Sequence, residues 1–144
     1  MKKFAFAALL SMISMPLLAA EHQVKMLNNG KDGSMVFEPS FLKIEKGDTV
    51  KFVKGDASHN SASVIVPANA KQWKGKMDEE IVVKPDQEGV YVYVCDPHKM
   101  MAMAGVIQVG KATNLEEAKK EAESLSKTFV MNKDRLSKAL AQVK

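Results

Sequence analysis

The chain has 144 residues, 46% of them hydrophobic and 26% charged, and its formal net charge at pH 7 is +4. A chain of this length and composition can bury one core, which excludes a disordered or fibrous protein and predicts a single domain. The charge is too small for a strongly basic nucleic-acid binder. The single cysteine, Cys95, excludes an internal disulfide framework. No stretch after residue 20 is apolar over the about 20 residues that a membrane span needs.

The N-terminus carries the three parts of an export signal. Lys2 and Lys3 give a positive start, residues 4–15 form an apolar run, and Pro16 is followed by apolar and small residues that end at Ala20. This order predicts a signal peptide over residues 1–20 and export to the periplasm. The apolar run is short and polar residues begin directly after Ala20, which favours a signal peptide over a membrane anchor.

Export makes the lone Cys95 unusual, because an exposed free thiol in an oxidising compartment is open to oxidation. No second cysteine is present to pair with it. We therefore expect a bound ligand to occupy Cys95 in the mature protein.

The mature chain begins as short β-rich runs separated by turn residues such as Asn29-Gly30 and Asp32-Gly33. Runs of this length and spacing are typical of a β-sandwich or barrel. The last apolar run before Asp96 is long and predicts a central strand. The predicted strands are His22–Leu27, Ser34–Phe37, Phe41–Ile44, Asp48–Val53, Ile81–Lys84, Gly89–Cys95 and Ala104–Val109.

The composition changes after Gly110. Asn114 is of a residue type that caps helices, and an amphipathic stretch over Leu115–Ser126 follows it. A second amphipathic stretch covers Lys133–Lys144. We predict one mainly β domain over residues 21–144, with a β-barrel over residues 21–110 and two C-terminal helices within residues 114–144.

Several metal-donor side chains lie in and near the segment after the predicted central strand. Cys95, His98 and Met103 fall within nine residues, and His59 lies further upstream. One thiolate, two imidazoles and a weak thioether are the donor set of blue-copper electron-transfer sites. Pro97 stiffens the step from Cys95 to His98. Structural zinc sites usually draw on more than one cysteine and not on methionine, so the donor set favours copper.

The donor set leaves the thioether ligand open, because Met100, Met101 and Met103 all follow Cys95 within eight residues. Here the sequence resembles the cupredoxins, and among them the pseudoazurins, whose loop places the axial ligand at the position of Met103. The shorter loop of the related amicyanins would select Met101. The segments that carry the resemblance are residues 26–28, 33–39, 47–50, 59–60, 93–98, 101–103 and 106–110.

The resemblance implies a Greek-key β-sandwich or barrel with two C-terminal α-helices, and one type 1 copper ion that alternates between Cu(I) and Cu(II). It also implies that Asn60 ties the His59 loop to the Cys95 loop and directs its backbone N–H at the Cys95 sulfur. Such bonds tune the copper potential. Met35 matches a residue close to the exposed histidine in that family, and as a strand residue it is equally well explained by core packing.

These features predict a monomeric one-electron carrier that catalyses no reaction alone. We expect the edge of the His98 ring to reach the surface through an apolar patch that includes Pro39, Pro97, Met100 and Ala102. Lysines around this patch would steer transient partners. The candidates are Lys31, Lys54, Lys74 and Lys99, with Lys71 and Lys76 as further ones.

The resemblance implies a redox partner such as copper nitrite reductase or a cytochrome. The chain departs from the family at three positions that bear on this point. Asn29 and Val94 stand where the family commonly has lysines, and Asp96 stands where the residue after the cysteine is usually threonine.

Other functions compete with this one. A copper delivery or storage protein would share the methionines and would release its metal readily. An amicyanin-like protein would accept electrons from methylamine dehydrogenase. A Cys–His nucleophilic enzyme would need an oxyanion hole, to which nothing in the sequence points. A further copper site could form at His22, next to the new N-terminus.

Overall fold

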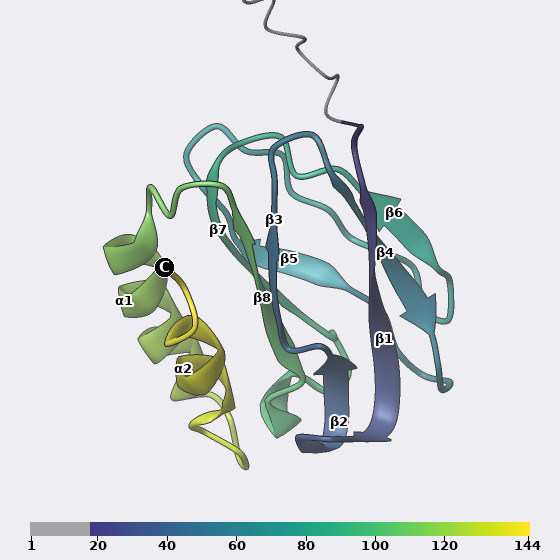
Figure 1. Cartoon of the computed structure of the whole chain (residues 1–144). Helices are drawn as coiled ribbons and strands as arrows, with labels where there is room; N and C mark the ends of the chain where they lie inside the picture. Colours follow the sequence, from purple (N-terminus) through teal and green to yellow (C-terminus); the bar gives the residue numbers. More distant parts are fainter. Residues whose placement is uncertain (1–17) are drawn as a thin grey trace, which may run out of the picture.

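The computed structural model describes residues 18–144, and residues 1–17 of the predicted signal peptide lie outside the described residues. Within the described part, two four-stranded sheets face each other and two helices cover the outer face of one of them (Figure 1). No helix of residues 18–144 is both long and apolar enough to span a membrane.

The first sheet has the strand order β2-β1-β4-β6, and the second has the order β3-β8-β7-β5. Each sheet contains one parallel pair, β1 with β4 and β3 with β8, among antiparallel neighbours. The strands are β1 (Glu21–Gly30), β2 (Gly33–Glu38), β3 (Phe41–Ile44), β4 (Thr49–Lys54), β5 (Ala62–Ile65), β6 (Ile81–Val83), β7 (Gly89–Val94) and β8 (Ala104–Val109).

The second sheet is buried on both faces. One face of β7 and β8, with Tyr91, Tyr93 and Ile107, packs against the first sheet. The opposite face, with Val92 and Val106, packs beneath the helices. This explains why every residue of β7 and β8 is buried and why β7 reads as a continuous apolar run, and β8 as one interrupted only by Gln108, rather than as alternating sequences. The predicted central strand is confirmed.

The Tyr93 ring of β7 packs closely over Gly105 of β8, next to the loop that follows β7. Tyr93 lies opposite Gly105 in the register, and a Cβ atom added at Gly105 would come within 2.4 Å of the Tyr93 ring. Phe37 and Phe52 pack edge-on against the same ring, with centroids 4.8 and 4.9 Å away. The strand that leads to Cys95 is therefore held by tight aromatic packing.

The predicted strands are all present: Phe41–Ile44 and Ala104–Val109 have their predicted bounds, and the ends of the others differ by at most three residues. Strand β5 was not predicted. Its four residues include the polar Ser63, Val64 is exposed, and the pairing with β7 shifts register between Ser63 and Ile65. A bulge of this kind breaks the two-residue period on which strand prediction depends.

The helices are α1 (Leu115–Ser126) and α2 (Arg135–Leu140), with a short 3-10 helix, η1 (Lys99–Met101), before β8. Helix α1 has its predicted bounds. The second helix is shorter than the predicted Lys133–Lys144 stretch, although its apolar residues Leu136 and Leu140 are buried as the pattern requires.

The prediction that the Asn114 side chain caps α1 is wrong. Asn114 precedes α1, but its side chain makes no cap bond to the helix. Its Oδ1 accepts from the Val90 N–H at 2.7 Å, and its Nδ2 donates to the Val90 carbonyl at 3.0 Å. The amide thus satisfies the backbone of a buried β7 residue and fixes the start of α1 to the sheet.

We predict that Asn114→Ala lowers the free energy of unfolding by about 1–3 kcal/mol, because it leaves both buried backbone groups of Val90 without partners. Urea denaturation of the metal-free protein measures this. Asn114→Ser, whose side chain can cap a helix but cannot span both Val90 groups, should not restore stability. Full stability of the serine variant would contradict the account.

Candidate metal centre

Four predicted donors come from two connections between strands that meet at one end of the sandwich. His59 lies in the connection from β4 to β5, Cys95 directly follows β7, His98 directly precedes η1, and Met103 directly precedes β8. The two ends of the loop from Cys95 to Met103 are fixed by β7 and β8, which pair up to Val94 and Ala104.

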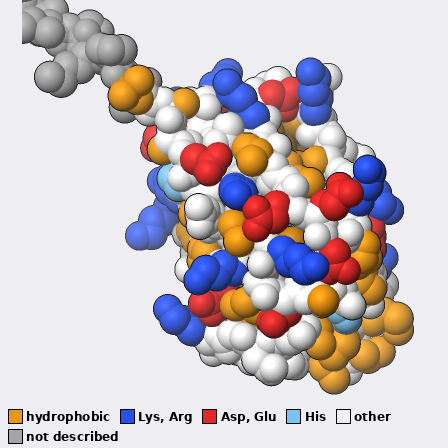
Figure 2. All heavy atoms as spheres, turned by 90° about the vertical axis from the view of Figure 1, so that its right-hand side faces the viewer, with side chains coloured by type: hydrophobic (Ala, Val, Ile, Leu, Met, Phe, Trp, Pro, Cys, Tyr) orange, Lys and Arg blue, Asp and Glu red, His pale blue; other side chains and the backbone are white. Residues whose placement is uncertain are grey.

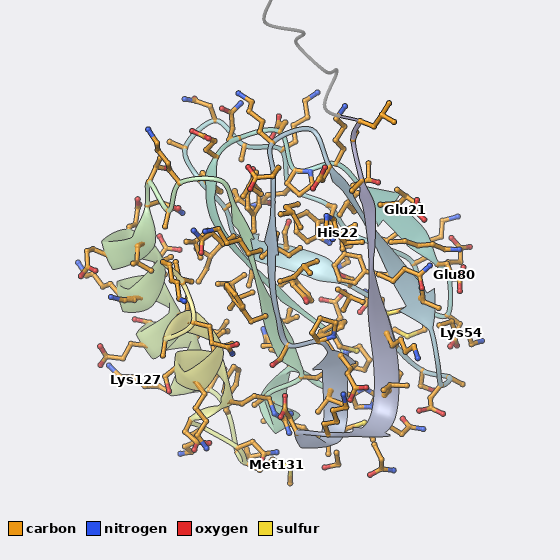
Figure 3. All side chains as sticks on the ribbon, viewed as in Figure 1. Glu21, His22, Lys54, Glu80, Lys127 and Met131 are labelled. Atoms are coloured by element: carbon orange, nitrogen blue, oxygen red, sulfur yellow. The ribbon has the colours of Figure 1, made fainter. Side chains whose placement is uncertain are left out.

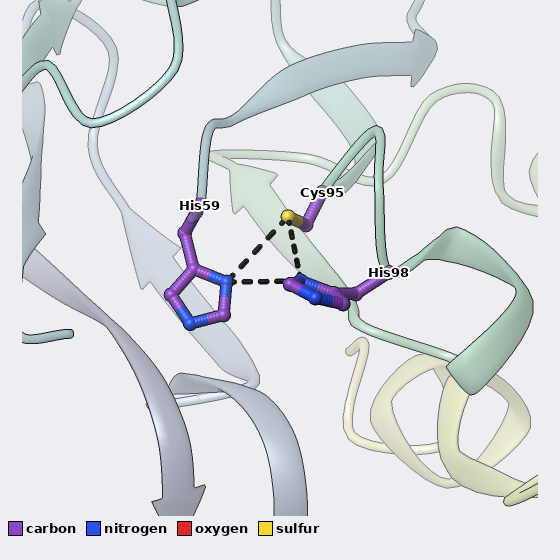
Figure 4. Close-up of side chains that lie close together, drawn as sticks. All are labelled: His59, Cys95 and His98. Carbon is purple, nitrogen blue, oxygen red and sulfur yellow. Dashed lines mark hydrogen bonds between the residues drawn. The ribbon is translucent and has the colours of Figure 1, made fainter. Parts of the chain in front are cut away.

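The donor atoms of three of these residues converge (Figure 4). The Cys95 sulfur lies 3.7 Å from His59 Nδ1 and 3.5 Å from His98 Nδ1, and the two Nδ1 atoms are 3.1 Å apart. Within residues 18–144 this is the one group of three or more histidine, cysteine or acidic side chains close enough to share a metal ion. His59 and Cys95 are fully buried, and His98 is partly exposed.

The protonation of His59 is fixed by Asn28 on β1. His59 Nε2 lies 2.9 Å from Asn28 Oδ1, which only accepts hydrogen bonds. The neutral ring therefore carries its proton on Nε2 and presents the Nδ1 lone pair to Cys95 and His98. Burial, reinforced by His98, lowers the pKa of His59 and keeps the ring neutral. This role of Asn28 was not predicted, because a single asparagine in a strand gives no signal of its partner.

Burial raises the pKa of the Cys95 thiol, while the backbone N–H groups of Asn60 and His98 oppose that shift. The Cys95 sulfur and the two Nδ1 atoms lie within 3.1–3.7 Å of one another and face a common point. A soft cation accepts electron pairs from all of them and displaces the thiol proton. The donor set thus fits a copper ion.

Met103 shares the core of Cys95, and both are fully buried. The Cys95 N–H donates to the Met103 carbonyl at 3.0 Å, and the Met103 N–H donates to the His98 carbonyl at 3.2 Å. Met101 is partly buried, and the Met100 side chain is 55% exposed.

Asn60 connects the His59 loop to the loop after Cys95. Its Oδ1 accepts from the Asp96 N–H at 2.8 Å, and its Nδ2 donates to the Asp96 carboxylate at 2.8 Å and to the Gly75 carbonyl at 3.1 Å. Lys74 pairs with the same carboxylate at 3.1 Å. These bonds lower the pKa of Asp96, and the hydrogen bond from Asn60 has the largest effect.

The expected apolar patch differs in composition from its prediction. Pro39, Pro97 and Met100 are exposed, but Ala102 is fully buried, so its place in the patch was wrong. Ala102 is buried because it turns the loop back toward β8 with its carbonyl directed at Arg135. Figure 2 shows apolar side chains gathered at the end of the molecule that carries the site.

Two exposed apolar residues of the connection from α1 to α2 were not anticipated. Val130 and Met131 are 62% and 42% exposed, and the Val130 N–H donates to the Met100 carbonyl at 2.8 Å. Figure 3 shows Met131 at this same end of the molecule. The connection therefore extends the apolar surface beside Met100.

Two of the candidate docking lysines lie in ion pairs. Lys54 pairs with Asp78 at 3.3 Å and Lys74 with Asp96 at 3.1 Å, whereas Lys31 and Lys99 have no such pair among the described residues.

His22, the other histidine considered, pairs with Asp48 at 2.8 Å. Met35 lies in β2, partly buried against the core.

Comparison with known proteins assigns the family. A family model described as copper binding proteins of the plastocyanin/azurin family matches residues 24–110. A putative pseudoazurin of Rhizobium leguminosarum is 46% identical over 130 residues, which cover 88% of this chain and 82% of that protein. The chain belongs to the pseudoazurin family. The pseudoazurin of Paracoccus pantotrophus is 39% identical over 96% of this chain and 94% of its own.

The structural comparison agrees. A pseudoazurin structure from Sinorhizobium meliloti superposes with a TM-score of 0.74 at 41% identity, covering 85% of this chain and 95% of the other. The predicted mainly β cupredoxin fold with two C-terminal helices is confirmed. As a pseudoazurin-family protein, the chain is an electron-transfer cupredoxin with one type 1 copper ion, and it is not an enzyme.

We predict that Asn28→Ala lowers copper affinity by about 10–100-fold, because the His59 ring loses the bond that fixes its orientation and tautomer. Competition with a copper chelator measures the affinity. The matched control is Asn29→Ala, since Asn29 is the exposed neighbour on the same strand. Equal affinity of the two variants would contradict the role of Asn28.

Proposed function

We propose that His59, Cys95, His98 and Met103 hold the copper ion, and that this chain carries single electrons between proteins of the periplasm. The convergence of the Cys95 sulfur and the two Nδ1 atoms within 3.1–3.7 Å carries the proposal. Bound copper supplies the one-electron Cu(II)/Cu(I) couple. The protein supplies a donor set that suits both states and is held by strands and buried bonds, so that few atoms move when the electron does.

Met103 is the better candidate for the fourth ligand than Met101. Its side chain is fully buried in the core that contains Cys95, and its backbone is bonded to both Cys95 and His98. The family spacing supports the same residue. The burial of Met103 and Cys95 also favours a closed carrier site over a copper delivery site, which would expose its thioethers for exchange.

His98 gives the electron its route to the surface. It is the only one of the four proposed ligands that is partly exposed, because the other three are fully buried. Pro97 and Met100 next to it are exposed and apolar, and Val130 lies beside Met100. An apolar surface of this kind lets a partner approach the ring edge closely and leave again without breaking strong bonds.

The proposed location rests on the sequence of residues 1–20, and the proposed partner, copper nitrite reductase, on the family resemblance. Lys31 and Lys99 supply positive charge that forms no ion pair within residues 18–144, while Asp78 and Asp96 offset Lys54 and Lys74. This surface should steer partners less strongly than one ringed by free lysines.

We predict that Met103→Leu raises the reduction potential, because a thioether donates electron density that favours the more positive oxidation state. Met101→Leu is the matched control and should leave the potential unchanged. Cyclic voltammetry of the copper-loaded variants measures both. A shift in the Met101 variant alone would instead support the shorter, amicyanin-like ligand spacing.

We also predict that the reduced protein donates electrons to purified copper nitrite reductase faster than an unrelated copper protein does, with a rate that falls as salt screens the lysines. Lys99→Glu should slow this reaction, whereas Lys120→Glu on α1 should not. Stopped-flow oxidation measures the rate. A rate no higher than that of the unrelated protein would exclude this partner while leaving the copper site intact.

A further inference from the structure

Arg135, the first residue of α2, lies buried beneath the copper-site end with only 7% of its surface exposed. Its guanidinium reaches two segments about a hundred and about thirty residues earlier in the chain. Nη1 donates to the carbonyls of Met35 at 2.8 Å, Ala102 at 3.1 Å and Met101 at 3.5 Å, and Nη2 donates to those of Ser34 at 3.0 Å and Asp32 at 3.1 Å.

Two of these carbonyls belong to residues in an unfavourable backbone conformation. Met35 has φ of 50° and Ala102 has φ of 60°, both in the left-handed region that residues with a Cβ atom rarely adopt. Both carbonyls accept from the same nitrogen, Nη1. The surrounding structure must stabilise such conformations for them to persist, and Arg135 does so at both places.

Ala102 is the residue that sets the direction of the chain into Met103. It ends η1, with its own N–H donating to the Lys99 carbonyl at 2.9 Å. A change in its backbone angles would move Met103 relative to Cys95 and His98. Helix α2 provides a fixed position for Arg135, because Leu136 and Leu140 are buried against the second sheet.

The charge of Arg135 has no direct counter-ion. Its polar contacts within residues 18–144 are backbone carbonyls, and the carboxylates of Asp32 and Asp134 act on its charge without forming an ion pair with it. A buried positive charge that contacts the loop disfavours the more positive of two oxidation states at a site nearby.

We propose that Arg135 is a positioning residue of the copper site: it holds Ala102 and Met35 in the left-handed conformation, thereby fixes Met103, and its charge raises the reduction potential. This inference rests on the proposed ligand role of Met103. It assigns a function in the redox site to the C-terminal helix, which contributes no ligand.

The test compares Arg135→Met with Leu140→Ala, which weakens the packing of α2 but leaves the guanidinium in place. In the copper-loaded Arg135→Met variant we expect a lower reduction potential, a shifted thiolate-to-copper absorption band, and copper affinity reduced by about 10-fold or more. Leu140→Ala should lower stability while the potential and the band stay those of the wild type. Equal behaviour of the two variants would show that Arg135 only stabilises the fold, and would overturn the proposal.

A second measurement separates the two contributions of Arg135. Glycine adopts the left-handed conformation without the Cβ penalty, so Ala102→Gly added to Arg135→Met should return the band toward the wild-type position while the potential stays low. A band that stays shifted would overturn the claim that Arg135 acts through Ala102. A potential that returns fully to the wild-type value would overturn the claim that its charge contributes.

Hydrogen exchange in the metal-free protein makes the proposal testable without copper. The Ala102 and Met103 amides donate within the loop, and they should exchange faster in Arg135→Met than in Leu140→Ala. Equal exchange rates of these amides in the two variants would contradict the proposal that Arg135 stabilises the loop. A wild-type protein that shows no thiolate-to-copper band at all would instead contradict the ligand assignment, so the two failures can be told apart.

Discussion

The hydrogen bond from the Cys95 N–H to the Met103 carbonyl is the constraint on which the site depends. It continues the antiparallel pairing of β7 and β8 by one step beyond Val94 and Ala104, and so closes the loop between the two strands. Because both strands are buried on both faces, their register cannot slip without moving apolar side chains out of the core. The separation of the thiol and the thioether backbones is therefore set by the sandwich and not by the metal.

The other donors are brought to this loop by bonds that cross between segments. Asn60 joins the His59 connection to Asp96, and Asn28 holds the far nitrogen of the His59 ring. Each bond satisfies a buried polar group and at the same time fixes a donor atom. Burial of Cys95 and His59 has a cost, visible in the raised pKa of the thiol and the lowered pKa of the imidazole. Bound copper offsets that cost, because it accepts the electron pairs that these groups cannot share with water.

Much of this arrangement could be predicted from sequence because it depends on local patterns. The apolar runs of β7 and β8, the period of α1 and the short spacing from Cys95 to Met103 are properties of neighbouring residues. What escaped prediction depends on contacts between distant segments. Asn28 of β1 bonds to His59 in the connection after β4, Asn114 bonds to Val90 instead of its own helix, and Arg135 bonds to residues of β2 and the copper loop. The burial of Ala102 follows from that last contact.

The visible absorption spectrum of the mature protein titrated with Cu²⁺, beside that of Cys95→Ser, tests the central claim most directly. An intense thiolate-to-copper band that saturates at one equivalent, is bleached by ascorbate and is absent from the serine variant is the result that this structure predicts. The serine variant is a sharp control, because it keeps both imidazoles and the fold while it removes only the sulfur. A faint band of equal strength in both proteins would mean that Cys95 does not hold the metal, and would contradict the account.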